Sequence, residues 1–141
     1  MKLNMIHLYP ELMSLYGEYA NLAVLCRHLQ DLGVETAIRG LTFEDEKDFS
    51  GADLIYMGAG TERSQKAVLT DLQPHAASLK AAVEAGAVLL FTGNAMEALG
   101  ASVTDKDGKV WQGLGVGDFT TVETDRRTPH DVLAAPVLWE E

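Results

Sequence analysis

The sequence predicts an α/β domain with a mostly parallel, doubly wound sheet. Short apolar runs typical of strands alternate along the chain with longer segments in which apolar residues recur at helical spacing. At 141 residues with 47% hydrophobic side chains, the chain is long enough to bury a substantial core. Two of the strand-like runs end in glycine-containing turns that lead directly into helical segments. Alternation of this kind implies right-handed crossovers and parallel pairing of the strands.

The first half of the chain contains three of the expected strands and one helix. We expect strands at 2–8, 34–41 and 52–58, the last of them apolar enough to be buried. Apolar residues recur at helical spacing over 19–32, and a glycine follows to end that helix. The single cysteine, Cys26, lies on this apolar stripe, so we interpret it as a buried core residue and not a nucleophile. A lone cysteine also excludes an internal disulfide and a multi-cysteine zinc site.

The second half begins with helical segments at 61–72 and 74–86, the second starting at a proline, which suits a first helical turn, and closing at a glycine. The apolar run 87–91 is the fourth expected strand, and a short helix follows its turn. The pattern then changes. Alternating segments within 101–124 flank an Asp-Gly pair at 107–108, which predicts a β-hairpin.

Composition excludes several classes of function. The net charge of −10, from 21 acidic and 11 basic residues, disfavours a nucleic acid or an anionic membrane as partner. No apolar run approaches the ~20 residues that cross a bilayer, and the N-terminus does not resemble a signal peptide. The acidic run 44–48 is typical of a solvated loop. We expect a cytoplasmic protein without metal or cofactor, because the four histidines (His7, His28, His75 and His130) lie in separate segments without metal-binding spacing.

Two turns are candidates for a ligand site, because ligands of parallel sheets lie beyond the carboxyl ends of the strands. The turn 58–64 contains glycines and then Thr61, a candidate helix N-cap, and we expect its free backbone N–H groups to face the site. Such donors hold a phosphate or an oxyanion. As a nucleotide-binding signature the turn is incomplete, since Arg63 stands where a third glycine belongs. Glycines that only join a strand to a helix are an equal alternative.

The second turn, 92–97, follows the fourth strand in the way that nucleophile elbows do in α/β enzymes. An elbow exposes one side chain at the start of a helix. This turn offers Thr92, Gly93 and Asn94, and neither a cysteine nor a serine. Because side chains alternate along a strand, we expect Thr92 to point away from the site.

Four segments occur in the order "LYPELMSLYGEYANLAVLCRHLQDLGV", "DLIYMGAGTERSQ", "LLFTGNAMEALG" and "DGKVWQGLGVGDF". Together they resemble class I glutamine amidotransferase-like domains of the cobyric acid synthase (CobB/CobQ) type, in particular the GatD-like glutaminase subunit of lipid II isoglutaminyl synthase. The Tyr-Gly-Glu-x-x-Asn start of the first helix and the "GAGTERSQ" loop are the most specific parts. The resemblance implies a flavodoxin-like three-layer fold with a C-terminal β-hairpin region, in a single domain over 1–141 that lacks the family's C-terminal part.

The resemblance also implies a chemistry, in which a cysteine thiolate at the elbow hydrolyses glutamine and a downstream histidine acts as base. Here Gly93 stands where the cysteine belongs, and we expect the sequence to end before the region of the histidine. We therefore expect no catalytic residue in this chain. By resemblance, residues 58–60 match the oxyanion-hole loop and Arg127 matches a basic residue linked to glutamine handling. The substrate-binding residues implied in this way are Gly58, Ala59, Gly60, Gly93, Asn94 and Arg127.

Several functions fit this pattern. The chain is either a binding or scaffolding subunit whose pocket is reused, or an amidotransferase component for which another group or chain supplies the chemistry. A small-molecule phosphate binder is a third hypothesis. The resemblance implies a synthetase or Mur-ligase-like partner subunit and glutamine or a related small molecule as ligand, with a cell-wall or cobyrinate-type acceptor equally open. The apolar segment 132–141 leads us to expect self-association.

Overall fold

The computed structural model of the chain describes residues 1–126, 131 and 133. Its main element is a four-stranded sheet in the order β2-β1-β3-β4, in which every pair of neighbours is parallel. The strands are β1 (Lys2–Leu8), β2 (Glu35–Leu41), β3 (Leu54–Met57) and β4 (Val88–Phe91). The four expected strands are confirmed, each within a few residues of its expected bounds, and their order is that of flavodoxin-like sheets.

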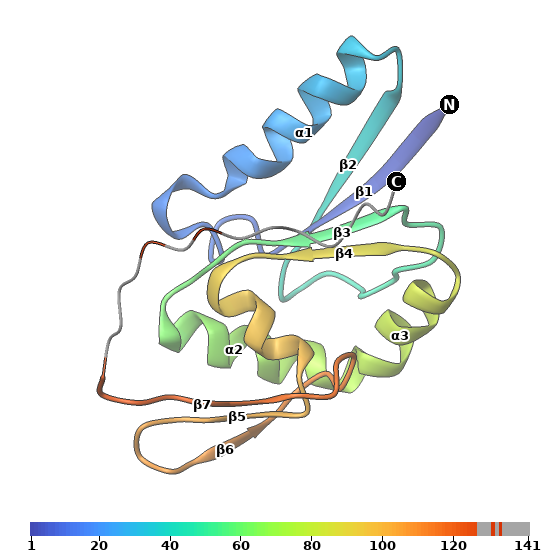
Figure 1. The fold of residues 1–141 in the computed structure, drawn as a ribbon. Helices are drawn as coiled ribbons and strands as arrows, with labels where there is room; N and C mark the ends of the chain where they lie inside the picture. Colours follow the sequence, from blue (N-terminus) through green and yellow to red (C-terminus); the bar gives the residue numbers. More distant parts are fainter. Residues whose placement is uncertain (127–130, 132, 134–141) are drawn as a thin grey trace.

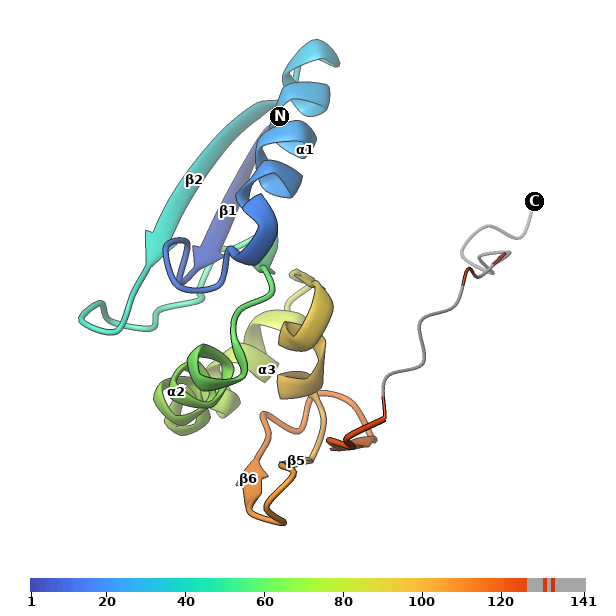
Figure 2. The ribbon, with the colours of Figure 1, turned by 90° about the vertical axis from the view of Figure 1, so that its left-hand side faces the viewer.

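Helices cover both faces of this sheet, which gives the expected three layers (Figure 1). α1 (Tyr19–Asp31) lies on one face, and α2 (Glu62–Leu72) and α3 (Ala76–Glu84) lie on the other. A short 3-10 helix, η2 (Gln73–His75), contains the proline and separates α2 from α3, so the interruption predicted there is confirmed. Figure 2 shows α1 beside β1 and β2, well apart from α2 and α3.

The core consists of two clusters because side chains alternate between the faces of each strand. On β3, Ile55 and Met57 belong to the larger cluster beneath α2 and α3, whereas Tyr56 belongs to a smaller one beneath α1. Cys26 is buried in the smaller cluster, packed with Met5 of β1. The interpretation of this cysteine as a core residue is confirmed.

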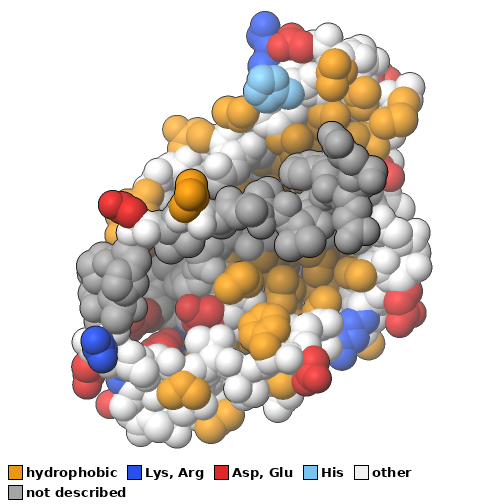
Figure 3. Space-filling view, viewed as in Figure 1, with side chains coloured by type: hydrophobic (Ala, Val, Ile, Leu, Met, Phe, Trp, Pro, Cys, Tyr) orange, Lys and Arg blue, Asp and Glu red, His pale blue; other side chains and the backbone are white. Residues whose placement is uncertain are grey.

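The face that carries α1 is only partly covered. The β3–β4 register places Val88 beside Leu54 and Leu90 beside Tyr56, so both β4 side chains project on the α1 side. Their exposed fractions are nevertheless 58% and 37%, because α1 packs over β2, β1 and β3 and leaves the edge strand β4 uncovered. Hydrophobic side chains are visible on this side of the molecule in Figure 3.

A second, smaller sheet follows β4. The connection is a 3-10 helix, η3 (Gly93–Leu99), which corresponds to the short helix predicted after the turn. β5 (Ser102–Thr104) and β6 (Val110–Gln112) form the predicted antiparallel hairpin, and β7 (Thr120–Val122) pairs with β5 in parallel. The pairing of β7 was not predicted. No helix in the described part of the chain is long and apolar enough to cross a membrane.

Candidate functional site

Three loops meet at the carboxyl edge of the main sheet. The first runs from the end of β1 to the start of α1, the second is the loop of residues 58–60 after β3, and the third is the turn of residues 92–94 after β4. β1 and β3 are neighbours, but the chain continues from them to helices on opposite faces of the sheet. Ligands bind at this position in folds of this kind. The two turns singled out in the sequence are therefore brought together, and the loop after β1 joins them.

The glycines of the 58–60 loop allow this close approach. A β-carbon on Gly58 would lie 2.5 Å from the carbonyl oxygen of Met13, and one on Gly60 would overlap the thioether of the same methionine. Met13 is fully buried and belongs to the larger hydrophobic cluster. Packing of the first loop therefore explains the glycine at both positions, and no bound ligand is needed to explain them.

The N–H groups of this loop are not free. The Ala59 N–H donates to Oε2 of Glu18 at 2.5 Å, and the Gly60 N–H donates to Oδ1 of Asn94 at 3.0 Å. The Asn94 side chain also donates from Nδ2 to the Gly60 carbonyl oxygen at 2.9 Å. The expectation of free donors in the loop is therefore wrong for these two residues. Both are buried, and a buried N–H that has no water partner must pair within the protein.

The 92–94 turn has the backbone of a nucleophile elbow. Thr92 is extended (φ −108°, ψ 152°), Gly93 is left-handed (φ +56°), and a helical segment follows. Position 93 is exposed to solvent, as an elbow nucleophile would be. A β-carbon there would lie 2.7 Å from the β-carbon of Ala59. The positive φ and the methyl group of Ala59 both favour glycine, so the elbow remains as a backbone turn without a reactive side chain.

Thr92 does not point away from the site, and that prediction was wrong. Its hydroxyl donates to Oε2 of Glu18 at 2.6 Å and lies 3.5 Å from the Tyr56 hydroxyl. Alternation along β4 does hold, since Thr92 projects to the same side as Leu90. The expectation failed because the first loop brings Glu18 to the edge on the α1 side, where α1 begins.

Tyr56 connects Glu18 to the start of α1. Its side chain is fully buried, and its hydroxyl donates to the Glu18 carbonyl oxygen at 2.7 Å and accepts from Nδ2 of Asn21 at 3.0 Å. Glu18 and Asn21 are the Glu and Asn of the Tyr-Gly-Glu-x-x-Asn segment. Sequence analysis singled out this segment as specific but did not assign Glu18 to the site, although the segment itself was the available signal.

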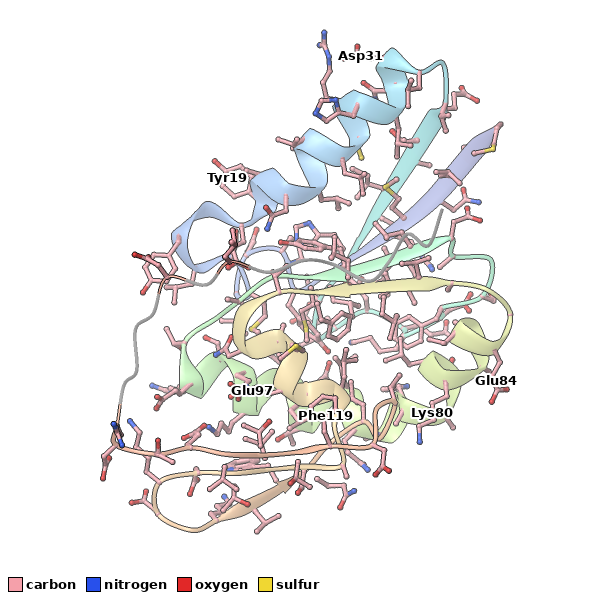
Figure 4. All side chains as sticks on the ribbon, in the orientation of Figure 1. Tyr19, Asp31, Lys80, Glu84, Glu97 and Phe119 are labelled. Atoms are coloured by element: carbon pink, nitrogen blue, oxygen red, sulfur yellow. The ribbon has the colours of Figure 1, made fainter. Side chains whose placement is uncertain are left out.

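Gln65 of α2 holds the turn and the helical segment that follows it. It is almost completely buried, and its Nε2 donates to the Asn94 carbonyl oxygen at 2.6 Å and to Oε2 of Glu97 at 2.7 Å. Figure 4 shows Glu97 on the helical segment that follows the elbow. At the start of α2, the Thr61 hydroxyl accepts from the Ser64 N–H at 3.1 Å, which confirms the predicted N-cap.

His7 is the titratable group nearest to this network on β1. It is 8% exposed, its ring centroid lies 5.1 Å from that of Tyr56, and within the described structure its Nε2 has no hydrogen-bond partner. Burial lowers the pKa of His7, because the charged imidazolium loses hydration. Among the described residues, no group of three or more histidine, cysteine, aspartate or glutamate side chains is placed to hold a metal. Arg127 and His130 lie outside the described residues.

Comparison with known proteins identifies the family of this chain. Residues 4–137 match the family described as the CobB/CobQ-like glutamine amidotransferase domain. The chain belongs to this family. Two similar proteins are both named lipid II isoglutaminyl synthase (glutamine-hydrolyzing) subunit GatD. The one from Streptococcus pneumoniae (strain ATCC BAA-255 / R6) is 28% identical over 93% of this chain and 51% of its own length. The one from Staphylococcus aureus (strain N315) is 24% identical over 94% of this chain and 54% of its own length.

Membership of the CobB/CobQ-like family confirms the resemblance seen in the sequence and the flavodoxin-like fold. The chain spans about half the length of the two GatD relatives. It is a glutamine amidotransferase-like domain related to subunits whose names describe them as glutamine-hydrolysing.

Proposed function

We propose that this CobB/CobQ-like domain does not hydrolyse glutamine by itself and acts as a binding or scaffolding subunit. The observation that carries the proposal is Gly93, at positive φ, at the point of the elbow where the family's thioester chemistry needs a thiolate. The Ala59 methyl group adds a second obstacle, because it lies only 2.7 Å from where the β-carbon of a nucleophile at position 93 would be.

The hydrogen-bond donors of the loop support the same proposal. An oxyanion hole works through donors that point at the position of the developing negative charge, at 2.7–3.1 Å in typical enzymes. Here the N–H of Ala59 is bound to a carboxylate of the protein and that of Gly60 to a side-chain amide. Rearrangement of Glu18 and Asn94 would have to precede any stabilisation of an oxyanion by these groups.

One contact favours a second candidate function. The hydroxyl of Thr92 lies 2.6 Å from a carboxylate oxygen of Glu18, which is the geometry of a hydroxyl nucleophile paired with a base. The same oxygen also accepts from the Ala59 N–H, so this carboxylate oxygen is already engaged by the loop and is a weaker base for the hydroxyl. We therefore rank a threonine-dependent hydrolase below the binding subunit.

We extend the proposal to partners by the family relationship. The similar GatD proteins are named as subunits, and we propose that this domain likewise docks to a synthetase or Mur-ligase-like subunit in the cytoplasm. Glutamine or a related small molecule is the proposed ligand of the loop and the elbow, and the acceptor is of the cell-wall or the cobyrinate type.

An assay of ammonia and glutamate release tests the proposal. We expect the purified protein incubated with glutamine to release no more of either product than a buffer control does. The variant Thr92→Val is the matched control, since it replaces the hydroxyl with a methyl group of similar size. Turnover that Thr92→Val abolishes would establish the second candidate. Turnover that survives this substitution would overturn the proposal and show that a group other than Thr92 is the nucleophile.

A further inference from the structure

The carboxylate of Glu18 is bound in the way that a protein binds a small anionic ligand. Its Oε2 accepts from the Ala59 N–H at 2.5 Å and from the Thr92 hydroxyl at 2.6 Å. Ala59 is 8% exposed, whereas Glu18 is half-buried. Hydrogen bonds to an ionised acceptor are shorter and about twice as strong as neutral ones. These two contacts are therefore a principal attachment of the loop to the elbow.

We propose that the Ala59 N–H and the Thr92 hydroxyl form a binding site for one carboxylate group, and that Glu18 is its resident occupant. The proposal goes beyond the proposed function, because it names the chemical class that the junction of the two turns binds. A small monocarboxylate enters the same site when the Glu18 side chain is absent.

The backbone at both donors is held by contacts that do not involve the Glu18 side chain. The Ala59 carbonyl oxygen accepts from the Leu15 N–H at 2.9 Å, and Met13 packs against the glycines on either side of Ala59. The backbone of Thr92 is held to β3, since its N–H donates to the Met57 carbonyl oxygen at 3.0 Å. A backbone held in this way needs little ordering when a ligand arrives, which favours binding.

The surroundings favour a small, singly charged ligand. Among the described residues, no lysine, arginine or histidine forms an ion pair with Glu18, so its charge is met by uncharged donors. A phosphate, with its higher charge and additional oxygens, requires more donors than these. Oε1 of Glu18 lies 3.8 Å from where a β-carbon of Gly93 would be, and the exposed glycine leaves that side open to solvent.

Rescue by external carboxylate tests the site. We expect Glu18→Ala to lower the melting temperature by several degrees. Increasing sodium acetate should then raise the melting temperature of this variant saturably, by about 3–5 °C, relative to sodium chloride at matched ionic strength. The natural protein should show no such difference between the salts, since its site is filled. The double variant Glu18→Ala/Thr92→Val removes one donor and should lose the response.

A second measurement applies if Glu18→Ala does not fold. In the natural protein, we expect the amide proton of Ala59 to resonate far downfield, and in Glu18→Gln, whose acceptor is neutral, to move upfield. The amide of Gly60, bound to Asn94, is the internal reference and should move less. The proposal is overturned if the Ala59 amide is unchanged in Glu18→Gln. It is also overturned if acetate stabilises Glu18→Ala no more than the natural protein or the double variant. Neither result depends on whether the protein releases ammonia.

Discussion

The β-carbon of Ala59 occupies the space next to Gly93 in which a side chain of the elbow would begin, since a β-carbon at position 93 would lie 2.7 Å from it. Gly93 lies in the strand-to-helix turn after β4. Ala59 belongs to the loop after the neighbouring strand β3, 34 positions earlier in the chain. The two positions are thus coupled sterically. A change at one of them has to be judged together with the residue at the other.

We predict that Gly93→Ala destabilises the protein by about 1–3 kcal/mol, from left-handed strain and overpacking together. The double variant Ala59→Gly/Gly93→Ala should recover the part that is due to the contact. Denaturant unfolding of the natural protein, the two single variants and the double variant measures the coupling. Gly108→Ala is the matched control, since Gly108 also has positive φ but would meet nothing within 4 Å. Additive effects at positions 59 and 93 would contradict the steric argument.

The same coupling predicts the outcome of introducing a thiol. Gly93→Cys, alone or with Ala59→Gly, should react with iodoacetamide, because position 93 is exposed. We expect neither variant to release ammonia from glutamine, because the Ala59 and Gly60 N–H groups remain bound to Glu18 and Asn94. The natural protein, whose only cysteine is buried, is the control for labelling. Robust glutaminase activity in either variant would show that these donors rearrange.

Stability should depend on pH through His7. Burial lowers the pKa of His7 below its ordinary value of 6.5, so at pH values just below 6.5 the unfolded chain binds this proton more readily than the folded protein does. The contribution of His7 to the free energy of unfolding is therefore fully present above pH 6.5. It declines as the pH falls toward the lowered pKa, with a slope of at most about 1.4 kcal/mol per pH unit. Denaturant unfolding between about pH 5 and pH 7 measures the slope.

The variant His7→Leu should reduce that slope, whatever its effect on absolute stability. His28→Leu, at an exposed position on α1, is the control for replacing a histidine with leucine. The carboxyl groups with shifted pKa values do not contribute to this slope. Hydrogen bonds lower the pKa values of Asp45, Asp48 and Asp105 from 3.8, so these groups titrate below the pH window of the measurement. An equal slope in the natural protein and in His7→Leu would contradict the prediction.

Lys47 should matter for stability although it lies in a segment that the sequence marks as solvated. Its side chain is 3% exposed, forms an ion pair with Asp71 at 3.0 Å, and donates to the Thr42 carbonyl oxygen at 2.5 Å. Asp71 also accepts from the buried Tyr9 hydroxyl at 2.5 Å. We predict that Lys47→Met costs about 1–3 kcal/mol, since it leaves a partly buried carboxylate without its cation.

The matched control for Lys47→Met is Arg27→Met, which breaks the exposed Arg27–Asp31 pair on α1. Exposed pairs of this kind contribute about 0–1 kcal/mol. Thermal and denaturant unfolding of the two variants should therefore differ clearly. Equal effects would mean that the Lys47 network adds nothing beyond an ordinary surface pair.

Self-association of the isolated protein remains a prediction. The segment 132–141, which lies largely outside the described residues, contains apolar side chains including Trp139, and Val88 and Leu90 of β4 are exposed. Apolar surface of this kind marks interfaces. We expect a dimer by light scattering, and a shift toward monomer on deletion of 132–141 or in Val88→Thr/Leu90→Thr. Leu32→Thr, at an exposed leucine just beyond α1, is the control, and a monomeric natural protein would contradict the prediction.

The sequence by itself determined the four main strands, the helices that cover them, the hairpin and the two turns after β3 and β4. Strand and helix patterns are local, because they follow from the spacing of apolar residues and from glycine and proline at the ends of elements. The Thr61 N-cap and the hairpin around 107–108 rest on neighbours within a few residues, and both are confirmed. Gly93 could likewise be assigned to the elbow from the sequence, since the turn follows its strand directly.

Only the tertiary structure decided what these turns contact. The Glu18 carboxylate bonds to residues 41 and 74 positions further along the chain, and Asn94 bonds to Gly60, 34 positions earlier. Such contacts depend on strand order, on the face at which each loop arrives and on side-chain rotamers, none of which a local pattern contains. For the same reason the direction of Thr92 was predicted wrongly. Alternation gives the face of a strand on which a side chain lies, and the packing of a distant loop decides which face holds the site.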